Sequence, residues 1–264
     1  MKAFANRAIA AAQTIPIRGD VDANLDQHRQ LIGLAADAHA QVVVFPELSL
    51  TGYEPDLAHG LAFSETDARL APLAELVSAC GMTVIVGAPV KVESQLHIGA
   101  FIVGPGRALD LYTKQHLGAF APGASLDGVV PPGEATVFHP GSLNPLVRFR
   151  GHTAAVAVCA DTKRPSHPQS AAQRGADVYL ASMFVIPADI EQETQALRSY
   201  AVRHSMAVVL ANYGGPSGGL TSGGRSAIWS EKGDLLVQLA ERGAGLAVAV
   251  ESESVWRADA IMLR

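Results

Sequence analysis

The sequence predicts a layered α/β fold, and two kinds of segment support this prediction. Short apolar runs rich in β-branched residues, such as 42–45 and 154–158, are typical of strands that are buried on both faces. Between such runs lie amphipathic stretches, such as 21–39, whose apolar residues recur at helical spacing. Because helices must cover the faces of such strands, the alternation indicates sheets flanked by helices.

In the first half of the chain, local signals set the ends of the predicted elements. Pro46 ends the second predicted strand, and Gly81 is a typical residue to close a helix. Gly104–Pro105–Gly106 marks a tight turn between two strands. The predicted elements are strands at 8–12, 41–45 and 83–86, helices at 21–39 and 66–80, and a hairpin of strands 97–103 and 107–112.

The second half repeats the alternation after a long loop rich in glycine and proline that follows Lys114. Apolar runs again predict strands, and amphipathic runs predict helices. A glycine-rich loop at 214–224 precedes further strands at the end of the chain. The predicted elements are strands at 146–149, 153–158, 178–181 and 207–211 and helices at 168–174 and 191–204.

Composition supports one domain over residues 1–264. The chain has 48% hydrophobic residues, which is enough for a sizeable core, and it contains no Ser/Pro-rich linker, charge run or low-complexity block. The Ala-rich start is interrupted by Arg7, and we interpret it as the first strand and not as a signal peptide.

Charge and hydropathy argue against several classes of partner. The formal net charge is −5 and no cluster of lysine and arginine residues occurs, so we expect no nucleic-acid partner. The apolar runs are too short to span a bilayer, so we expect no membrane segment. The two cysteines, Cys80 and Cys159, form no CxxC pair. This argues against a disulfide framework or a zinc site and favours the cytoplasm.

Glu47 is the first residue that could carry chemistry, because it closely follows the predicted strand 41–45. Leu48, Leu50 and Tyr53 keep its surroundings apolar, and desolvation raises the pKa of a carboxylate toward the range of a useful base. The alternative is a surface carboxylate that caps the next segment.

Lys114 is the second candidate, since it follows a strand that ends in Leu111–Tyr112. A lysine in such a position is often a surface residue that keeps its amino group in solvent. Held near a thiol and a carboxylate, the same ammonium would support thiolate formation and stabilise an oxyanion.

Cys159 is the third candidate, and it follows the apolar run 154–158 and precedes a polar turn. A cysteine in this setting is often an inert core residue. On a strand-to-helix turn, however, its thiol would be exposed, and the backbone N–H of Ala160 would be a candidate oxyanion donor. A free thiol would also need a base to react near neutral pH.

Taken together, these segments resemble the nitrilase, or carbon–nitrogen hydrolase, superfamily. The matching stretches are FPEL-x-LTGY at 45–53, Y-x-K-x-HL at 112–117, and V-x-V-CAD with the later P, A and GAD at 156–177. ANYGGPSGG at 211–219 and GRSAIW at 224–229 resemble later segments of the superfamily. The resemblance therefore covers nearly the whole chain.

The resemblance implies a four-layer α-β-β-α sandwich with no metal and no organic cofactor. It also implies that Glu47 deprotonates Cys159, that the thiolate attacks a small amide or N-carbamoyl compound, and that Lys114 and the Ala160 N–H hold the oxyanion. Water would then hydrolyse the thioester. Members commonly pair through helices beside the cysteine segment, so a homodimer or a higher homo-oligomer is expected.

The chain departs from the superfamily pattern after Lys114, where many members have a second glutamate that orients the lysine and the substrate. No carboxylate occurs before Asp127, and Glu134 comes later still. We favour Glu134 for this role, because Phe138 and Pro140–Gly141 after it resemble the usual continuation. The alternative is that the role is empty, which would put full activity in doubt more than the fold.

Further candidates for substrate binding lie near the three catalytic candidates. Two follow the nucleophile on the same turn, two stand at the end of the next strand, and one lies close to the candidate base. They are Asp161, Arg164, Ser182, Met183 and Tyr53. Asp161 could instead cap a turn or helix. His167 would permit a Cys–His pair, which explains less of the sequence than the Glu–Lys pair.

Three classes of function remain open on the sequence alone. The leading hypothesis is an amidase that acts on a small amide or an N-carbamoyl compound. The second is acyl transfer, in which the same thioester passes to an amine. The third is a binding protein that kept the fold but lost turnover, which the late second glutamate suggests and the three catalytic candidates oppose. Likeness of fold does not identify the substrate.

Overall fold

The computed structural model describes residues 6–125 and 128–263. Its strands are β1 Arg7–Gln13, β2 Val42–Val44, β3 Phe63–Ser64, β4 Thr83–Val92, β5 Gln95–Val103, β6 Asp110–Thr113, β7 Leu146–Phe149, β8 His152–Val158, β9 Val178–Ser182, β10 Ala207–Ala211, β11 Ala227–Trp229, β12 Leu235–Gln238, β13 Gly245–Ser252 and β14 Val255–Met262. Its α-helices are α1 Val21–Asp37, α2 Ala58–Leu61, α3 Ala71–Cys80, α4 Ser166–Gln173 and α5 Ile190–His204.

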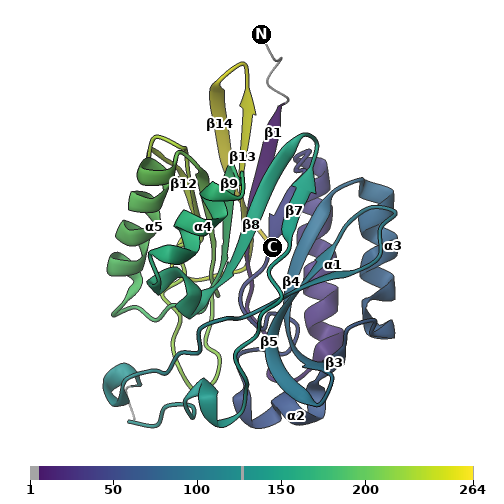
Figure 1. The fold of residues 1–264 in the computed structure, drawn as a ribbon, viewed down its shortest axis with the longest axis vertical. Helices are drawn as coiled ribbons and strands as arrows, with labels where there is room; N and C mark the ends of the chain where they lie inside the picture. The colour runs from purple at the N-terminus through teal and green to yellow at the C-terminus, as the bar shows by residue number, and fades with distance from the viewer. Residues whose placement is uncertain (1–5, 126–127, 264) are drawn as a thin grey trace.

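In the described part of the chain, the strands form two sheets that lie between two layers of helices. The eight-stranded sheet has the order β14-β13-β1-β2-β4-β5-β6, with β3 beside β4. The six-stranded sheet has the order β12-β11-β10-β9-β8-β7. Helices α1 and α3 lie on one side of the molecule, and α4 and α5 lie on the other (Figure 1). The expected four-layer α-β-β-α sandwich is therefore confirmed.

The central strands are continuously apolar because each of them is buried on both faces. In β1, Ile9 and Ala11 face the core between the two sheets, whereas Ala10 and Ala12 face the helices α1 and α3. In β8, Val156 likewise faces the inter-sheet core, while its neighbours face α4 and α5. Side chains alternate between the faces of a strand, so a strand in the middle of a four-layer fold needs apolar residues at every position.

The second predicted helix corresponds to α3, which begins later than the sequence predicted. The predicted segment 66–80 contains a 3₁₀ turn at Ala68–Leu70, and α3 begins only at Ala71, directly before Pro72. Proline favours the first turn of a helix, where its missing N–H would have no partner. The predicted end is confirmed, because Gly81 has a φ of +67° and donates its N–H to Val77 O at 2.9 Å.

The predicted strand 83–86 is also longer than expected. β4 continues to Val92 and pairs with β5 in antiparallel register, from Val84 opposite Val103 to Val92 opposite Gln95. The chain then turns at Glu93, which has a φ of +54°, and returns as β5.

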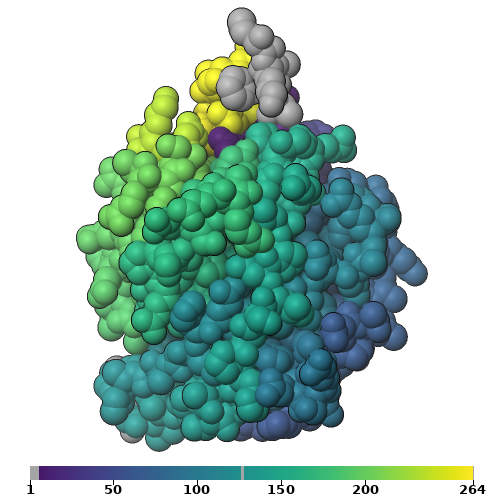
Figure 2. Space-filling model, in the orientation of Figure 1, coloured from purple at the N-terminus to yellow at the C-terminus, as the bar shows by residue number. Residues whose placement is uncertain are grey.

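Strand ends from both sheets meet at one place in the molecule. The segment after β2 in one sheet lies over the end of β9 in the other, and the hydroxyl of Ser182 donates a hydrogen bond to Phe45 O at 2.8 Å. The described parts of the connection from β6 to β7 run over the lower surface in Figures 1 and 2. In the part of the chain that is described, none of the helices combines the length and the apolar character needed to cross a membrane.

Candidate active site

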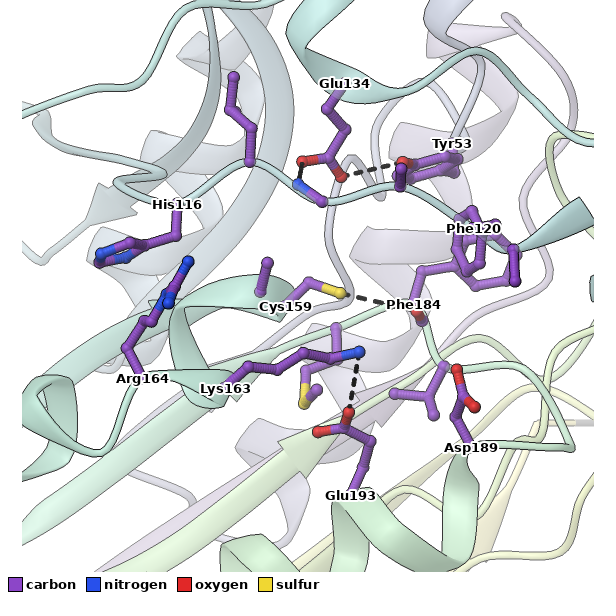
Figure 3. Close-up of a pocket in the computed structure, with 17 residues that line it drawn as sticks. Tyr53, His116, Phe120, Glu134, Cys159, Lys163, Arg164, Phe184, Asp189 and Glu193 are labelled. Atoms are coloured by element: carbon purple, nitrogen blue, oxygen red, sulfur yellow. Dashed lines mark hydrogen bonds and ion pairs between the residues drawn. The ribbon is translucent and has the colours of Figure 1, made fainter.

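Cys159 lies on a tight turn at the end of β8. It begins the 3₁₀ turn η5, Cys159–Lys163, and has a φ of +42°. A residue with a side chain pays a conformational cost in this region, and such positions are often found at functional sites. The turn presents the thiol to a cavity, with Sγ 3.7 Å from Phe184 O (Figure 3).

Glu47, Lys114 and Glu134 form a buried chain of ion pairs. Lys114 Nζ lies 2.6 Å from Oε1 of Glu47 and 2.7 Å from Oε1 of Glu134. The side chains of Glu47 and Lys114 have no exposed surface, and that of Glu134 is 2% exposed. The structure thus places Glu134 beside the lysine. The other residue considered for this role, Asp127, lies outside the described residues.

Glu134 is itself held by two further contacts. Its Oε1 accepts a hydrogen bond of 2.9 Å from the hydroxyl of Tyr53, and its Oε2 accepts one of 2.7 Å from the backbone N–H of Gly118. The backbone N–H of Glu134 donates to Gly118 O at 3.0 Å. These contacts hold Glu134 against Lys114, which lies 20 residues earlier in the chain.

The backbone around Glu47 is fixed from several sides. The Tyr213 hydroxyl donates a hydrogen bond to the carbonyl oxygen of Glu47. On the neighbouring strand β4, a Cβ added at Gly87 would lie 2.4 Å from Leu48 N and 2.8 Å from Pro46 O. Glycine at position 87 therefore allows the two backbones to approach and sets the height of the Glu47 loop above β4.

The environment of Glu47 tunes its proton affinity. Burial raises the pKa of Glu47 to about 7, against the lowering effect of the Lys114 ammonium and with a smaller raising effect from Glu134. Its Oε2 is buried without a hydrogen-bond partner among the described residues. This oxygen is therefore free to accept a proton near neutral pH.

The thiol and the ammonium have pKa values that fit these neighbours. Burial, and then the Glu47 carboxylate, raise the pKa of the Cys159 thiol, so the thiol is protonated at rest. For Lys114, burial favours the neutral amine, but the carboxylates, chiefly Glu47, raise the pKa overall and keep the ammonium charged. The site therefore combines a protonated thiol, a carboxylate with a pKa near neutrality and a fixed positive charge.

A cavity of about 430 Å³ opens beside the Cys159 thiol. Several residues that the sequence identified line it, and Glu47 and Lys114 lie behind its wall with no exposed surface. The identified residues in the lining are Tyr53, Glu134, Cys159, Ala160, Arg164 and Met183. Figure 3 shows Glu134 and Tyr53 on one side of Cys159 and Lys163, Glu193 and Asp189 on the other.

Two residues predicted for the pocket are absent from its lining, and this corrects the sequence interpretation. Asp161 is fully buried, and its carboxylate accepts hydrogen bonds from the backbone, including His116 N–H at 2.8 Å. Ser182 is also fully buried, and its hydroxyl donates a hydrogen bond to Phe45 O. A strand end orients alternate side chains to opposite faces, so Met183 reaches the cavity where Ser182 does not.

The alternative Cys–His pair gains no support from the position of His167. One ring nitrogen, Nε2, lies 3.0 Å from the Tyr112 hydroxyl, and Nδ1 lies 2.8 Å from the Tyr179 hydroxyl. Both nitrogens are therefore engaged in a buried network away from the thiol. In the described part of the chain, no group of three His, Cys, Asp or Glu side chains could hold a metal ion.

Two acidic residues at the start of α5, one at its N-cap and one in its first turn, were missed by the sequence interpretation. Asp189 and Glu193 line the cavity, and Glu193 Oε1 lies 3.2 Å from Lys163 Nζ. Burial lowers the pKa of Lys163, but the Glu193 carboxylate raises it, and the net shift is upward. Asp189 and Glu193 both lie at the start of a helix that follows strand β9, whose end lies at the cavity, and this position could have identified them from the sequence.

Comparisons with known proteins give a consistent result. The sequence profile of the family described as carbon-nitrogen hydrolase matches residues 8–258. A nitrilase from Pyrococcus abyssi is 28% identical over 250 residues, which cover 91% of this chain and 88% of that protein. A glutamine-dependent NAD(+) synthetase from Thermotoga maritima is 29% identical over 174 residues, 65% of this chain. The matched segment spans only 28% of the synthetase.

Solved structures of an amidase from Nesterenkonia sp. AN1 have the same fold. A cysteine-to-alanine mutant in complex with butyramide has a TM-score of 0.81 and 25% identity, and the match covers 95% of this chain and 92% of that chain. A glutamate-to-glutamine mutant, with the acetamide moiety of fluoroacetamide added covalently at the active site cysteine, also has a TM-score of 0.81, 25% identity and coverage of 94% and 90%.

The named relatives include a nitrilase and an amidase, which supports a hydrolase domain that acts on carbon–nitrogen bonds other than peptide bonds. The profile match extends over nearly the whole described chain, including Cys159 and the three residues of the buried chain of ion pairs. The chain therefore belongs to the carbon–nitrogen hydrolase family, within the nitrilase superfamily.

Proposed function

We propose that this protein hydrolyses a small amide or an N-carbamoyl compound through a thioester on Cys159. The observation that carries the proposal is the buried Glu47–Lys114–Glu134 chain beside the strained turn of Cys159. Three charged side chains are costly to bury unless they are paired, and here the pairing leaves a basic oxygen and an ammonium next to a thiol.

The first half of the reaction would form the thioester. Cys159 Sγ attacks the carbonyl carbon while its proton passes to Oε2 of Glu47, the oxygen that lacks a partner. The carbonyl oxygen becomes an oxyanion, held by the N–H of Ala160 and by Lys114. Glu47 then gives its proton to the nitrogen, the C–N bond breaks, and ammonia or an amine leaves.

The second half would release the acid. Glu47 removes a proton from water, the hydroxide attacks the thioester carbon, and the same donors hold the second oxyanion. The C–S bond breaks, the acid leaves, and the proton on Glu47 returns to Cys159. The pKa of about 7 for Glu47 suits a group that must accept and return a proton twice in each turnover.

Glu134 would act by fixing the direction of the Lys114 ammonium. An ammonium has three N–H donors, and the two carboxylates accept two of them at 2.6 and 2.7 Å. The third donor is left for the oxyanion. Preorganised donors of this kind stabilise a transition state without reorganisation at the moment of reaction.

The test is ammonia release across small aliphatic amides, dicarboxylate monoamides, N-carbamoyl amino acids and nitriles. We expect release from an amide or N-carbamoyl compound by the wild type and none by Cys159→Ala. Undiminished release by Cys159→Ala would remove Cys159 from the mechanism, and no release from any compound would overturn the hydrolase proposal.

The same assay separates hydrolysis from acyl transfer. Addition of hydroxylamine should divert part of the thioester to a hydroxamate, while water alone should give the free acid. An enzyme that forms hydroxamate but releases no acid in the absence of an amine would be an acyltransferase, the second candidate on the sequence.

We further propose a single catalytic domain over residues 1–264 that works as a homodimer or higher homo-oligomer in the cytoplasm. The proposal of self-association rests on the resemblance to the superfamily, whose members commonly pair through helices beside the cysteine segment. Light scattering on the purified protein checks the oligomeric state, and a monomer across the accessible concentration range would contradict it. Cell fractionation tests the compartment.

A further inference from the structure

Asp161 joins the segment that carries Lys114 to the turn that carries Cys159. Its carboxylate is fully buried two residues after the nucleophile. Oδ1 accepts hydrogen bonds from the backbone N–H groups of Gln115 at 3.1 Å and of His116 at 2.8 Å. The ring Nδ1 of His116 lies 3.0 Å from the same oxygen.

The second oxygen of Asp161 reaches strands of both sheets. Oδ2 accepts hydrogen bonds from the Tyr112 hydroxyl at 2.7 Å and from the backbone N–H of Val158 at 3.2 Å. Tyr112 lies on β6 of the eight-stranded sheet, and Val158 is the last residue of β8 in the six-stranded sheet. One carboxylate therefore connects the two sheets at the active site.

The contacts require a carboxylate and not merely a polar side chain. A carboxylate accepts at both oxygens, and every partner of Asp161 named above can donate. Asparagine would replace one acceptor by an NH₂ group. Whichever way the amide turned, that group would face a backbone N–H, either at Gln115 and His116 or at Val158, and one link would be lost.

We propose that Asp161 is a positioning residue that fixes Lys114 relative to the Cys159 turn and so assembles the oxyanion site; this rests on the proposed function. Gln115 directly follows Lys114, and Val158 directly precedes Cys159, so each link acts one residue from a reacting group. A displacement of about 1 Å between catalytic groups can lower a rate by about 100-fold.

Two reactions of the same thiol separate this role from a general role in folding. With p-nitrophenyl acetate, the Cys159 thiol loses its proton to Glu47 and Sγ bonds to the carbonyl carbon. An oxyanion forms and collapses as p-nitrophenolate leaves, and a thioester remains. With 2-iodoethanol, which has no carbonyl group, the thiol again loses its proton to Glu47, Sγ bonds to the CH₂ carbon that carries the iodine, iodide leaves and no oxyanion forms. Only the first reaction needs Lys114 and the Ala160 N–H to be placed together around an oxyanion.

The decisive variant is Asp161→Asn, with Tyr200→Phe as its matched control. We expect Asp161→Asn to slow acylation by the ester about 100-fold while alkylation by 2-iodoethanol keeps the wild-type rate. The hydroxyl of Tyr200 donates to Thr162 O at 2.8 Å, on the same turn, without a contact to Asp161. Tyr200→Phe should therefore leave the ratio of the two rates unchanged.

An equal fall in both rates, or no fall in acylation, would overturn the proposal. If Asp161→Asn does not fold, Tyr112→Phe removes only the hydroxyl that donates to Oδ2. This variant should slow acylation by a smaller factor with alkylation unchanged, and wild-type acylation in it would also overturn the proposal.

The wild type distinguishes this proposal from the proposed function. Acylation by the ester without hydrolysis of any amide would contradict the proposed function and leave the role of Asp161 to be judged from the variants. Alkylation without any acylation would mean that there is no oxyanion site to position, and would overturn the role of Asp161.

Discussion

The hydroxyl of Tyr53 donates a hydrogen bond of 2.9 Å to Oε1 of Glu134, the same oxygen that lies 2.7 Å from Lys114 Nζ. Tyr53 therefore shares in the orientation of the lysine, although it touches neither Lys114 nor Glu47 in a hydrogen bond that the structure records. Burial raises the pKa of Tyr53 well above its usual value, so the hydroxyl remains a donor over the whole working range of pH.

The wild-type enzyme should lose activity in acid. Glu47 has a pKa raised to about 7, chiefly by burial, and only its ionised form can accept the proton of Cys159. As the pH falls below about 7 the carboxylate becomes protonated, so kcat/KM should decline about tenfold per pH unit. A pH–rate profile checks this, and a flat profile from pH 5 to 8 would contradict the role of Glu47 as base.

Glu134→Gln should lower kcat and also move the acid limb of the pH profile. Loss of the carboxylate leaves Lys114 with one anchor, and we expect kcat to fall by about 100-fold. The charge of Glu134 raises the pKa of Glu47, so its removal should shift the limb to lower pH.

Tyr53→Phe is the matched control for Glu134→Gln. It removes a hydrogen bond to the same oxygen but keeps the negative charge of Glu134. We expect kcat to fall by about tenfold, which corresponds to one hydrogen bond to a charged group, with the acid limb in its wild-type place. Equal shifts of the limb in both variants would contradict an electrostatic effect of Glu134.

The sequence was sufficient for the fold because the layered core leaves a periodic signature. Strands such as β1 and β8 are apolar at every position, since each faces a core on both sides. Helix α1 was recognised for the same reason, because its apolar face repeats at helical spacing. The missed part of β4 includes Gly87 and Pro89, residues that single-sequence rules treat as strand breakers.

Side-chain direction at the site was less predictable than chain order. Glu47, Lys114 and Cys159 could be identified because each follows a predicted strand. This pattern does not predict which neighbouring side chains face the cavity. Asp161 and Met183 illustrate the difference, since Asp161 is directed into the protein and Met183 into the pocket. Long-range contacts decide this, and a sequence position does not encode them.

Cys159→Ala and Cys159→Gly should both be inactive, but they should differ in stability. The φ of +42° at this position is unfavourable for alanine and acceptable for glycine. We expect the glycine variant to be more stable than the alanine variant by about 1 kcal/mol, or about 2–4 °C in the midpoint of thermal unfolding. A lower midpoint for the glycine variant would contradict backbone strain at position 159.

Gly87→Ala should disable the active site by displacing the Glu47 loop from the neighbouring strand β4. Its Cβ would lie 2.4 Å from Leu48 N and 2.8 Å from Pro46 O, and backbone atoms cannot rotate away as a side chain can. The loop must move as a unit and carry Glu47 away from Cys159, so we expect kcat to fall by about 100-fold. Steady-state kinetics beside thermal unfolding of the same sample measure both effects.

Gly99→Ala is the control that shows whether Gly87→Ala acts by moving Glu47 or by lowering the stability of the fold. Gly99 lies on the next strand, β5, and a Cβ there would lie 2.6 Å from Val90 Cγ1 and 3.2 Å from Leu111 Cδ1, both side-chain atoms. Overpacking of this kind lowers the free energy of unfolding by about 1–3 kcal/mol. The crowded atoms do not belong to the Glu47 loop. Gly99→Ala should therefore unfold at lower temperature with near wild-type kcat. A similar loss of kcat in both variants would mean that crowding in the sheet, and not the approach of Gly87 to Leu48, controls the base.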